Sequence, residues 1–215
     1  MKGPNWFYEN RIKKMGFKFI AGADEAGRGA LAGPVVVASV MIDLEKREKI
    51  SRKLKKKNLQ VRDSKLLTFL QREKILEVIK EENIDWAVGV VSNREIDKRG
   101  INWAVSQALK KAIQKLRHQP DFLLLDAGIN PPKRMNIPFK LIIKGDNKVF
   151  SCGLASIIAK VYRDKIMIKY SRRFPQYHFE EHKGYGTKKH FSQLNKFGPS
   201  NIHRLSYYPL NILNR

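Results

Sequence analysis

The sequence contains a single cysteine, Cys152, among its 215 residues. A disulfide within the chain is therefore excluded, and so is a metal site built from several cysteines. Scarcity of cysteine is typical of proteins from reducing compartments, and we expect a cytoplasmic location.

Long apolar runs are also missing. No stretch approaches the roughly 18 consecutive apolar residues that a membrane-spanning helix needs. The basic stretch at residues 1–17 lacks the apolar segment of a secretory signal peptide. We therefore expect a soluble, unprocessed protein with no membrane partner. There is no internal repeat, and the lysine-rich segment at 45–62 is the only region of biased composition.

Acidic residues are scarce relative to basic ones. The chain has 20 Asp and Glu against 43 Lys and Arg, which gives a formal net charge of +23. Such an excess favours a polyanionic partner, most often nucleic acid, although genome bias or adaptation to heat produces a similar composition. Hydrophobic residues make up 42% of the chain, enough for a packed core. At this length we expect one domain, at most with a small appendage.

The most informative acids are adjacent. Asp24 and Glu25 follow an apolar stretch at 17–21, and a glycine-rich turn separates them from a β-branched stretch at 35–40. This order predicts a strand, a site and a second strand. Neighbouring strand residues point to opposite faces, so the two carboxylates serve one site only if the backbone bends there. Paired acids beside a cation and exposed amides suit a divalent metal next to a phosphate. A hairpin loop with solvated charges is the simpler alternative.

Asp126 ends a buried apolar run at 122–125. Ligands of α/β sheets gather at the carboxyl ends of strands, which places this residue where it can join Asp24 and Glu25. Capping of the following turn is the alternative role.

Asp164 falls within the apolar stripe of a long helix, which the pattern predicts from about 151 to 172. A carboxylate on such a face needs a compensating cation. The cation is either a salt-bridge partner or a metal shared with the other acids. The basic neighbours Lys160, Arg163 and Lys165 are expected to point away, which favours the metal.

Other segments complete an alternating α/β order. Apolar runs predict strands at 86–91 and 139–143, and an apolar stripe predicts a helix over 104–116. Capping boxes are expected at Thr68 with Gln71 and at Ser92 with Glu95.

Two basic regions have an open interpretation. The lysines at 53–57 are either a solvated face or a surface that contacts phosphates. Beyond residue 173, aromatic residues alternate with Lys, Arg and His. They can stack on nucleotides, but we favour the packing of a small helical lobe for most of them. The histidines there have no spacing that indicates a metal site.

Together, these motifs resemble those of ribonuclease HII, the type 2 ribonuclease H. The similarity runs in order along nearly the whole chain. The matching segments are GADEAGRGALAGPVV at 22–36, DSKLL at 63–67, NWAVSQAL at 102–109, LLLDA at 123–127, KGD at 144–146, ASIIAKVYRDKIM at 155–167, HKGYGTKKH at 182–190 and HRLSYYP at 203–209.

The resemblance implies an α/β, ribonuclease H-like fold: a mixed five-stranded sheet flanked by helices, with a helical C-terminal part. Residues 1–215 are then a single catalytic domain, with its core at about 17–172 and a substrate-binding part at about 173–215. The resemblance also implies a site. Its catalytic and metal-binding acids are Asp24, Glu25, Asp126 and Asp164, and its substrate-binding residues are Gly27, Arg28, Gly29 and Tyr185. We also expect Lys65 and Arg204 to bind substrate, Arg204 by holding phosphates without reading sequence.

The implied cofactors are Mg²⁺ or Mn²⁺, with two ions bound when substrate is present. The implied enzyme is an endoribonuclease that hydrolyses the RNA strand of RNA/DNA hybrids and cuts 5′ of ribonucleotides embedded in DNA duplexes. The products carry 5′-phosphate and 3′-hydroxyl ends, and the reaction serves ribonucleotide and primer RNA removal. We expect a monomer. A sliding-clamp partner stays open, because no obvious clamp-binding motif precedes Arg215.

Three alternatives differ in chemistry. A basic RNA-binding protein explains the charge but not Asp164 in an apolar stripe. A resolvase or transposase of the same fold superfamily shares the acids but has no reason to carry GRG and KGYGT. Ribonuclease HIII has a GTG-like turn after its acidic pair, whereas Arg28 gives this chain GRG.

Overall fold

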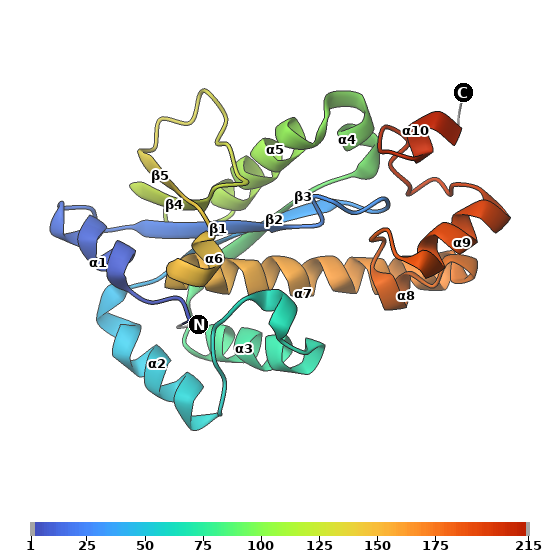
Figure 1. Ribbon diagram of the computed structural model, residues 1–215. Helices are drawn as coiled ribbons and strands as arrows, with labels where there is room; N and C mark the ends of the chain where they lie inside the picture. Colours follow the sequence, from blue (N-terminus) through green and yellow to red (C-terminus); the bar gives the residue numbers. More distant parts are fainter. Residues whose placement is uncertain (1–2, 214–215) are drawn as a thin grey trace.

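A mixed five-stranded sheet forms the centre of the computed structural model, which describes residues 3–213 (Figure 1). The strand order is β3-β2-β1-β4-β5. β1 to β3 form an antiparallel meander, and β4 and β5 run parallel to β1. The strands are β1 Ile20–Ala26, β2 Val35–Met41, β3 Asp85–Val91, β4 Phe122–Asp126 and β5 Phe139–Ile142. The expected fold class is confirmed.

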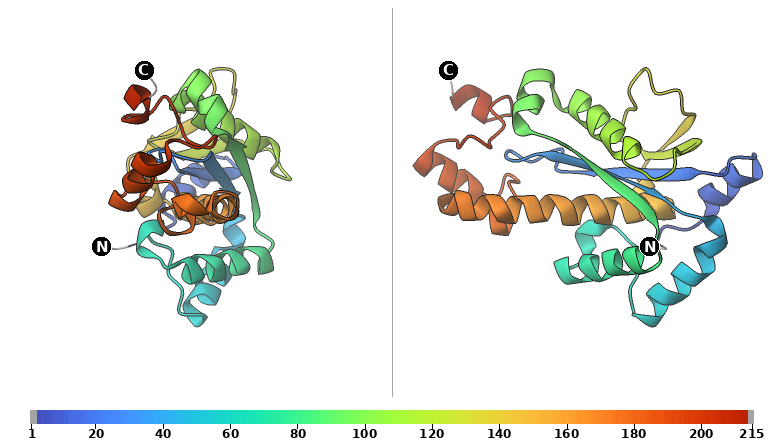
Figure 2. Two further views of the ribbon diagram at one scale, coloured as in Figure 1. Left: turned by 90° about the vertical axis from the view of Figure 1, so that its right-hand side faces the viewer. Right: turned by 180° about the vertical axis from the view of Figure 1, so that it is seen from behind.

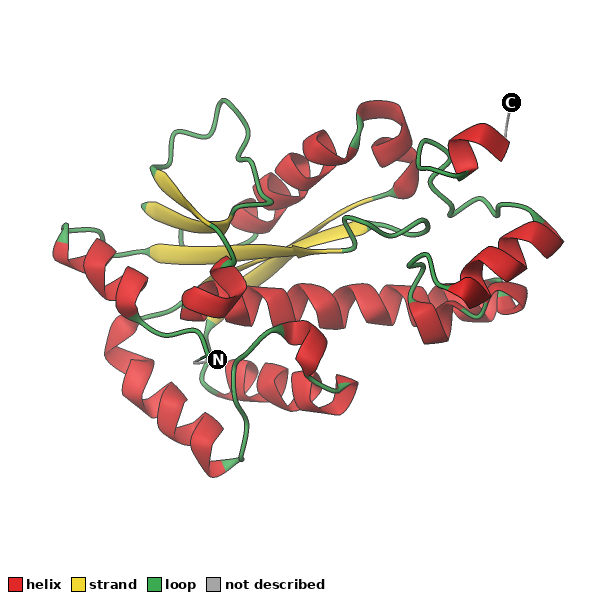
Figure 3. Cartoon of the chain, viewed as in Figure 1, coloured by secondary structure: helices red, strands yellow, loops and turns green. Residues whose placement is uncertain are grey.

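Helices cover both faces of this sheet (Figures 2 and 3). The longest is α7, whose observed bounds agree with the predicted helix to within one residue at either end. The helices are α1 Phe7–Lys14, η1 Leu44–Lys46, α2 Arg47–Lys56, η2 Ser64–Leu66, α3 Phe69–Glu81, α4 Asn93–Arg99, α5 Ile101–Gln114, α6 Gly145–Lys148, α7 Phe150–Arg173, η3 Pro175–Tyr177, α8 Phe179–His182, α9 Lys188–Phe197 and α10 Leu210–Leu213.

Strand β2 explains how the two faces are packed. All of its residues are buried, and their side chains alternate between two cores. Val36, Ala38 and Val40 join the core that includes residues of α7 and α3. Val35 and Val37 join the core that includes residues of α5. A strand covered on both faces reads as a continuous apolar run, which is the pattern in the sequence.

Local signals at the helix ends were predicted correctly. Thr68 and Gln71 form a capping box at α3, and Ser92 and Glu95 form one at α4. Each box satisfies backbone N–H groups that the first helical turn leaves without partners.

The lysine-rich segment forms helix α2. Lys53 pairs with Glu81 and Glu82, and Lys57 pairs with Glu81. These two lysines therefore have partners at the end of α3. The pairing favours a solvated face over a surface that contacts phosphates.

The C-terminal part gathers at the far end of α7, beside the turn between β1 and β2 (Figure 1). Its core includes Tyr177 and Phe179, both buried. The preferred interpretation of the aromatics as lobe packing is confirmed for these two residues. Among residues 3–213, no helix is both long and apolar enough to cross a membrane.

Candidate active site

Three of the predicted acids meet at the carboxyl end of the sheet. Asp24, Glu25 and Asp126, here called the strand-end acids, each offer an oxygen within 4.8 Å of the others. The first two lie within β1, which stays paired with β2 as far as Ala26. Pairing of β1 with β4 stops earlier, at Ala23 opposite Leu125. Asp24 and Glu25 therefore occupy a part of β1 that is not paired with β4.

Local backbone fixes these carboxylates. The N–H of Gly145 donates to Asp126 Oδ1 over 2.6 Å, and the N–H of Glu25 donates to Asp24 Oδ1 over 2.8 Å. Gly128 provides the space for Glu25, since a Cβ at that position would lie 2.7 Å from Glu25 Oε1. The loop after β4 thus leaves room for Glu25, and Gly145, at the start of α6, holds Asp126.

The electrostatics of the cluster favour a cation. Burial, followed by the charge of Glu25, raises the pKa of Asp24 well above its ordinary value. Burial also raises the pKa of Glu25, although Arg28 opposes the shift. Glu25 Oε2 is buried and has no hydrogen-bond partner among residues 3–213. Carboxylate oxygens are the ligands that Mg²⁺ and Mn²⁺ prefer, and several of them are crowded together here, so the residues present fit such an ion.

Asp164 has a different environment. It is buried, as its position in the stripe predicts, but Lys160 Nζ lies 2.8 Å from its Oδ1 and Arg72 Nη2 lies 3.2 Å from its Oδ2. The expectation that Lys160 points away is wrong, because residues four apart lie on one helix face. The salt-bridge alternative describes this structure, and Asp164 stands outside the strand-end cluster. Its role as a metal ligand stays a prediction.

A cleft of about 800 Å³ contains the strand-end acids, the GRG turn and Tyr185. Its wall also includes Asp63, Lys144, Asp146 and Lys160, to which no role was given from the sequence. Burial, followed by Asp126 and Asp63, raises the pKa of Asp146. A usable signal existed for this residue, since KGD comes just after β5 and Asp126 ends β4. Lys65 is exposed at the rim, as a phosphate contact requires.

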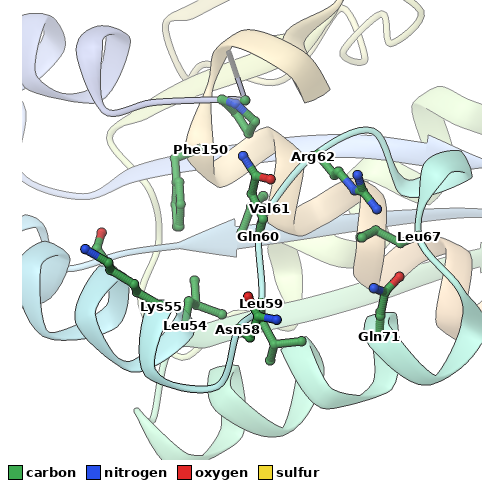
Figure 4. A pocket seen from close by; sticks show the side chains of 13 residues that line it. Leu54, Lys55, Asn58, Leu59, Gln60, Val61, Arg62, Leu67, Gln71 and Phe150 are labelled. Carbon is green, nitrogen blue, oxygen red and sulfur yellow. The ribbon is translucent and has the colours of Figure 1, made fainter. Parts of the chain in front are cut away.

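A separate pocket of about 570 Å³ is lined in part by the segment 59–62 (Figure 4). Lys55 and Arg62 are its charged lining residues, and its wall contains no carboxylate side chain. It therefore lacks the carboxylate ligands that gather at the strand-end acids.

Arg163 links the two segments expected to contact substrate. Its guanidinium is buried, donates to the carbonyls of Ala32, Pro34 and Lys183, and lies 5.1 Å from the ring centroid of Tyr185. A Cβ on Gly27 would lie 1.9 Å from Arg163 Nε, so this turn approaches α7 at a residue without a side chain.

The expectation for Arg204 needs correction. Its side chain is fully buried, at 0% exposure, and donates to the carbonyls of Gly33 and Arg28 over 3.0 and 2.9 Å. It supports the GRG turn from within and presents no surface to a phosphate. Sequence pattern could not show this, because the carbonyls lie more than 170 residues away along the chain.

Comparisons with known proteins agree with this geometry. The family model described as Ribonuclease HII matches residues 21–209. A protein named Ribonuclease HII from Caldicellulosiruptor saccharolyticus is 46% identical over 204 residues, covering 94% of each chain.

Solved structures are similar as well. The ribonuclease H2 of Pyrococcus horikoshii OT3 aligns with a TM-score of 0.71 at 27% identity, covering 91% of this chain and 96% of the other. The ribonuclease HII in a complex with PCNA from Archaeoglobus fulgidus also aligns with a TM-score of 0.71, at 26% identity, covering 88% and 95%.

Proposed function

Because the chain belongs to the ribonuclease HII family, it is a metal-dependent endoribonuclease of RNA/DNA hybrids, and we propose that it also cuts 5′ of single ribonucleotides in DNA duplexes. The observation that carries the proposal is one cleft shared by the strand-end acids, the GRG turn and Tyr185. Metal ligands and groups suited to sugar recognition thereby face the same bound strand.

Asp24, Glu25 and Asp126, with Asp164 as a fourth acid, would hold two Mg²⁺ or Mn²⁺ ions. When bound, the ions supply an activated water and stabilise the leaving 3′ oxygen, so that in-line hydrolysis yields 5′-phosphate and 3′-hydroxyl ends. The N–H of Gly145 holds the Asp126 carboxylate in place before the ions bind. Lys160 and Arg72 hold Asp164, which requires Asp164 to exchange a salt bridge when it becomes a ligand.

Selection of ribonucleotides requires contact with the 2′-hydroxyl. The carbonyl of Arg28 accepts from Arg204 and from the hydroxyl of Tyr207. In a planar trans peptide the N–H points opposite to the carbonyl, so the N–H of Gly29 points away from these buried partners. This supports reading of the 2′-hydroxyl by the backbone of Gly27 to Gly29, with Tyr185 packing on the next deoxyribose.

The partners follow from this chemistry. We propose RNA/DNA hybrids and ribonucleotide-containing duplexes as substrates, for ribonucleotide and primer RNA removal. A sliding-clamp partner, suggested by the Archaeoglobus fulgidus complex with PCNA, and a monomeric state are separate proposals. Size-exclusion chromatography with and without a purified clamp tests both.

Cleavage assays test the proposed function. The substrates are a labelled DNA duplex with one ribonucleotide, the same duplex in pure DNA, and a long RNA/DNA hybrid, each with Mg²⁺, Mn²⁺ or EDTA. We expect a metal-dependent cut 5′ of the ribonucleotide and an intact pure DNA duplex. Cleavage of the long hybrid alone would contradict the proposal. It would indicate a preference like that of ribonuclease HIII, whose members generally cut single embedded ribonucleotides poorly.

A further inference from the structure

Two buried histidines lie behind Tyr185, and the proposed catalysis does not use them. His190, on α9, and His203 are 0% and 1% exposed. Their Nε2 atoms lie 3.0 Å apart. His190 Nδ1 lies 3.0 Å from the carbonyl oxygen of Tyr185, and His203 Nδ1 lies 2.8 Å from the backbone nitrogen of Ser200. We call His203 and His190 the histidine relay.

Their partners fix where the protons lie. The N–H of Ser200 can only donate, so His203 Nδ1 carries a lone pair and the proton of the neutral ring is on Nε2. The Ser200 hydroxyl, whose Oγ is also 2.8 Å from Nδ1, can donate to the same lone pair. The carbonyl of Tyr185 can only accept, so His190 Nδ1 carries the proton and its Nε2 carries a lone pair. His203 Nε2–H then donates to His190 Nε2. Only one arrangement of protons satisfies the chain from Ser200 to Tyr185.

Both rings must be neutral for this chain to form. A second proton on His190 would face the Nε2–H of His203. A second proton on His203 would face the N–H of Ser200, even if the Ser200 hydroxyl turned to accept it. Burial, reinforced by the neighbouring histidines, lowers the pKa of His190 to about 4 and the pKa of His203 to about 3. The neutral forms are therefore the stable ones near pH 7.

The relay connects two substrate-facing segments. At one end His190 holds the backbone of Tyr185. At the other end, His203 forms an isolated β-bridge with Ala32, in the loop that follows the GRG turn. The neighbouring hydrogen bonds from Arg204 N to Leu31 O and from Gly33 N to Ile202 O strengthen this attachment.

We propose that His190 and His203 are positioning residues that hold Tyr185 at a fixed place relative to the GRG turn and so set the preference for a single embedded ribonucleotide. The inference rests on the proposed function. Without the Nε2–H of His203, the buried Nε2 of His190 has no donor. Leaving this buried acceptor without a donor is costly, and the cost is relieved when the ring moves toward water, which weakens its contact with the Tyr185 carbonyl.

A matched pair of variants tests the relay. His203→Gln places an amide N–H near the position of Nε2, whereas His203→Leu removes the donor and keeps an apolar side chain of similar size. The measured quantity is kcat/KM on the single-ribonucleotide duplex divided by kcat/KM on a long hybrid. We expect this ratio to fall about three- to tenfold in the Leu variant, the effect of one net hydrogen bond, and to change less than about twofold in the Gln variant.

Two further variants isolate the path through Tyr185. In a Tyr185→Ala background, His203→Leu should leave the ratio unchanged, because the relay then has no ring to position. His178→Asn is the control, since His178 lies outside the relay and has φ of 54°, a conformation that Asn tolerates. It should not change the ratio.

Nitrogen NMR of the histidine side chains shows which ring nitrogen carries the proton, and the measurement needs no substrate. The chain has five histidines, so the variants assign each signal. We expect a neutral Nε2–H form for His203 and a neutral Nδ1–H form for His190 at pH 7, and loss of the defined His190 form in His203→Leu.

Three results would overturn the relay: the opposite tautomers, an equal loss on both substrates in His203→Leu, or a full effect in the Tyr185→Ala background. A wild-type enzyme that does not cut at a single ribonucleotide would instead refute the proposed function. The tautomers then decide separately whether the histidines form the relay.

Discussion

The strand-end acids and the histidine relay are both buried polar clusters, but their hydrogen-bond inventories differ. Each nitrogen of the relay meets a complementary partner, from Ser200 to Tyr185. Among the strand-end acids, acceptors outnumber donors, and Glu25 Oε2 has no partner within residues 3–213. The relay is complete within the protein. The acids need a cation and a substrate from outside.

Burial acts in the same direction on both clusters, since it favours the neutral form of every group. Neutral rings are the forms that the relay needs. A neutral carboxyl is a poor metal ligand, so the raised pKa of Asp24 opposes its proposed role until a divalent cation reverses the balance. The comparison therefore distinguishes a site that is stable as built from one that is stable only when occupied.

Removal of one strand-end acid should give the largest effect. Asp24→Asn keeps an oxygen that can accept from the Glu25 N–H but removes a charged ligand. We expect cleavage to fall roughly a thousandfold, since stabilisation by a metal contributes several kcal/mol. Duplex binding in EDTA, measured by fluorescence anisotropy, should be retained. A fully active variant would remove Asp24 from the metal site.

A smaller loss is expected when the acids are displaced rather than removed. In Gly128→Ala the new Cβ would lie 2.7 Å from Glu25 Oε1, so the carboxylate must move. We expect activity to fall roughly ten- to a hundredfold, with a higher Mg²⁺ concentration needed for half-maximal rate. The thermal midpoint should hardly change, because a flexible side chain absorbs the shift. Unchanged metal dependence would separate Glu25 from the metal site.

The stability of the metal-free protein gives a third test. The folded pKa of Asp24 is raised, so its neutral form is favoured and its contribution to stability is lost as pH rises through that pKa. Asp24→Asn removes this loss. In EDTA at neutral pH, the thermal midpoint of the variant should exceed that of wild type. Each kcal/mol gained in the free energy of unfolding should raise the midpoint by about 2–4 °C, and the difference should shrink toward pH 4. A difference that grows on acidification would contradict the raised pKa.

The smallest effect concerns surface cations outside both clusters. Lys65 is exposed at the cleft, whereas Lys53 is paired with Glu81 and Glu82. Substitution of either by Gln removes the same charge. We expect Lys65→Gln to reduce the slope of log Kd against log salt by about 0.9, the value for one phosphate contact, and Lys53→Gln to leave it unchanged. A slope in Lys65→Gln equal to that of wild type would remove Lys65 from the phosphate contacts.

Residues with a local signal were predicted well. Apolar runs located the strands, and the boxes at Thr68 and Ser92 marked two helix starts. Asp24, Glu25 and Asp126 were found together because strand ends of an α/β sheet converge. Lys160 was misjudged although the i, i+4 spacing was visible. Arg204 was misplaced because a cation in a basic segment looks like a surface residue until its partners are known.

The sequence by itself determined which segments are strands and helices, which acids end or occupy strands, and the family, because these depend on short-range patterns and ordered motifs. Only the tertiary structure decided that Arg72 neutralises Asp164, that Arg204 supports the GRG turn, and that His203 orders His190. The physical reason is common to all three. A buried polar group needs a hydrogen-bond partner, and folding can supply that partner from any part of the chain. The sequence around the group therefore does not identify the partner.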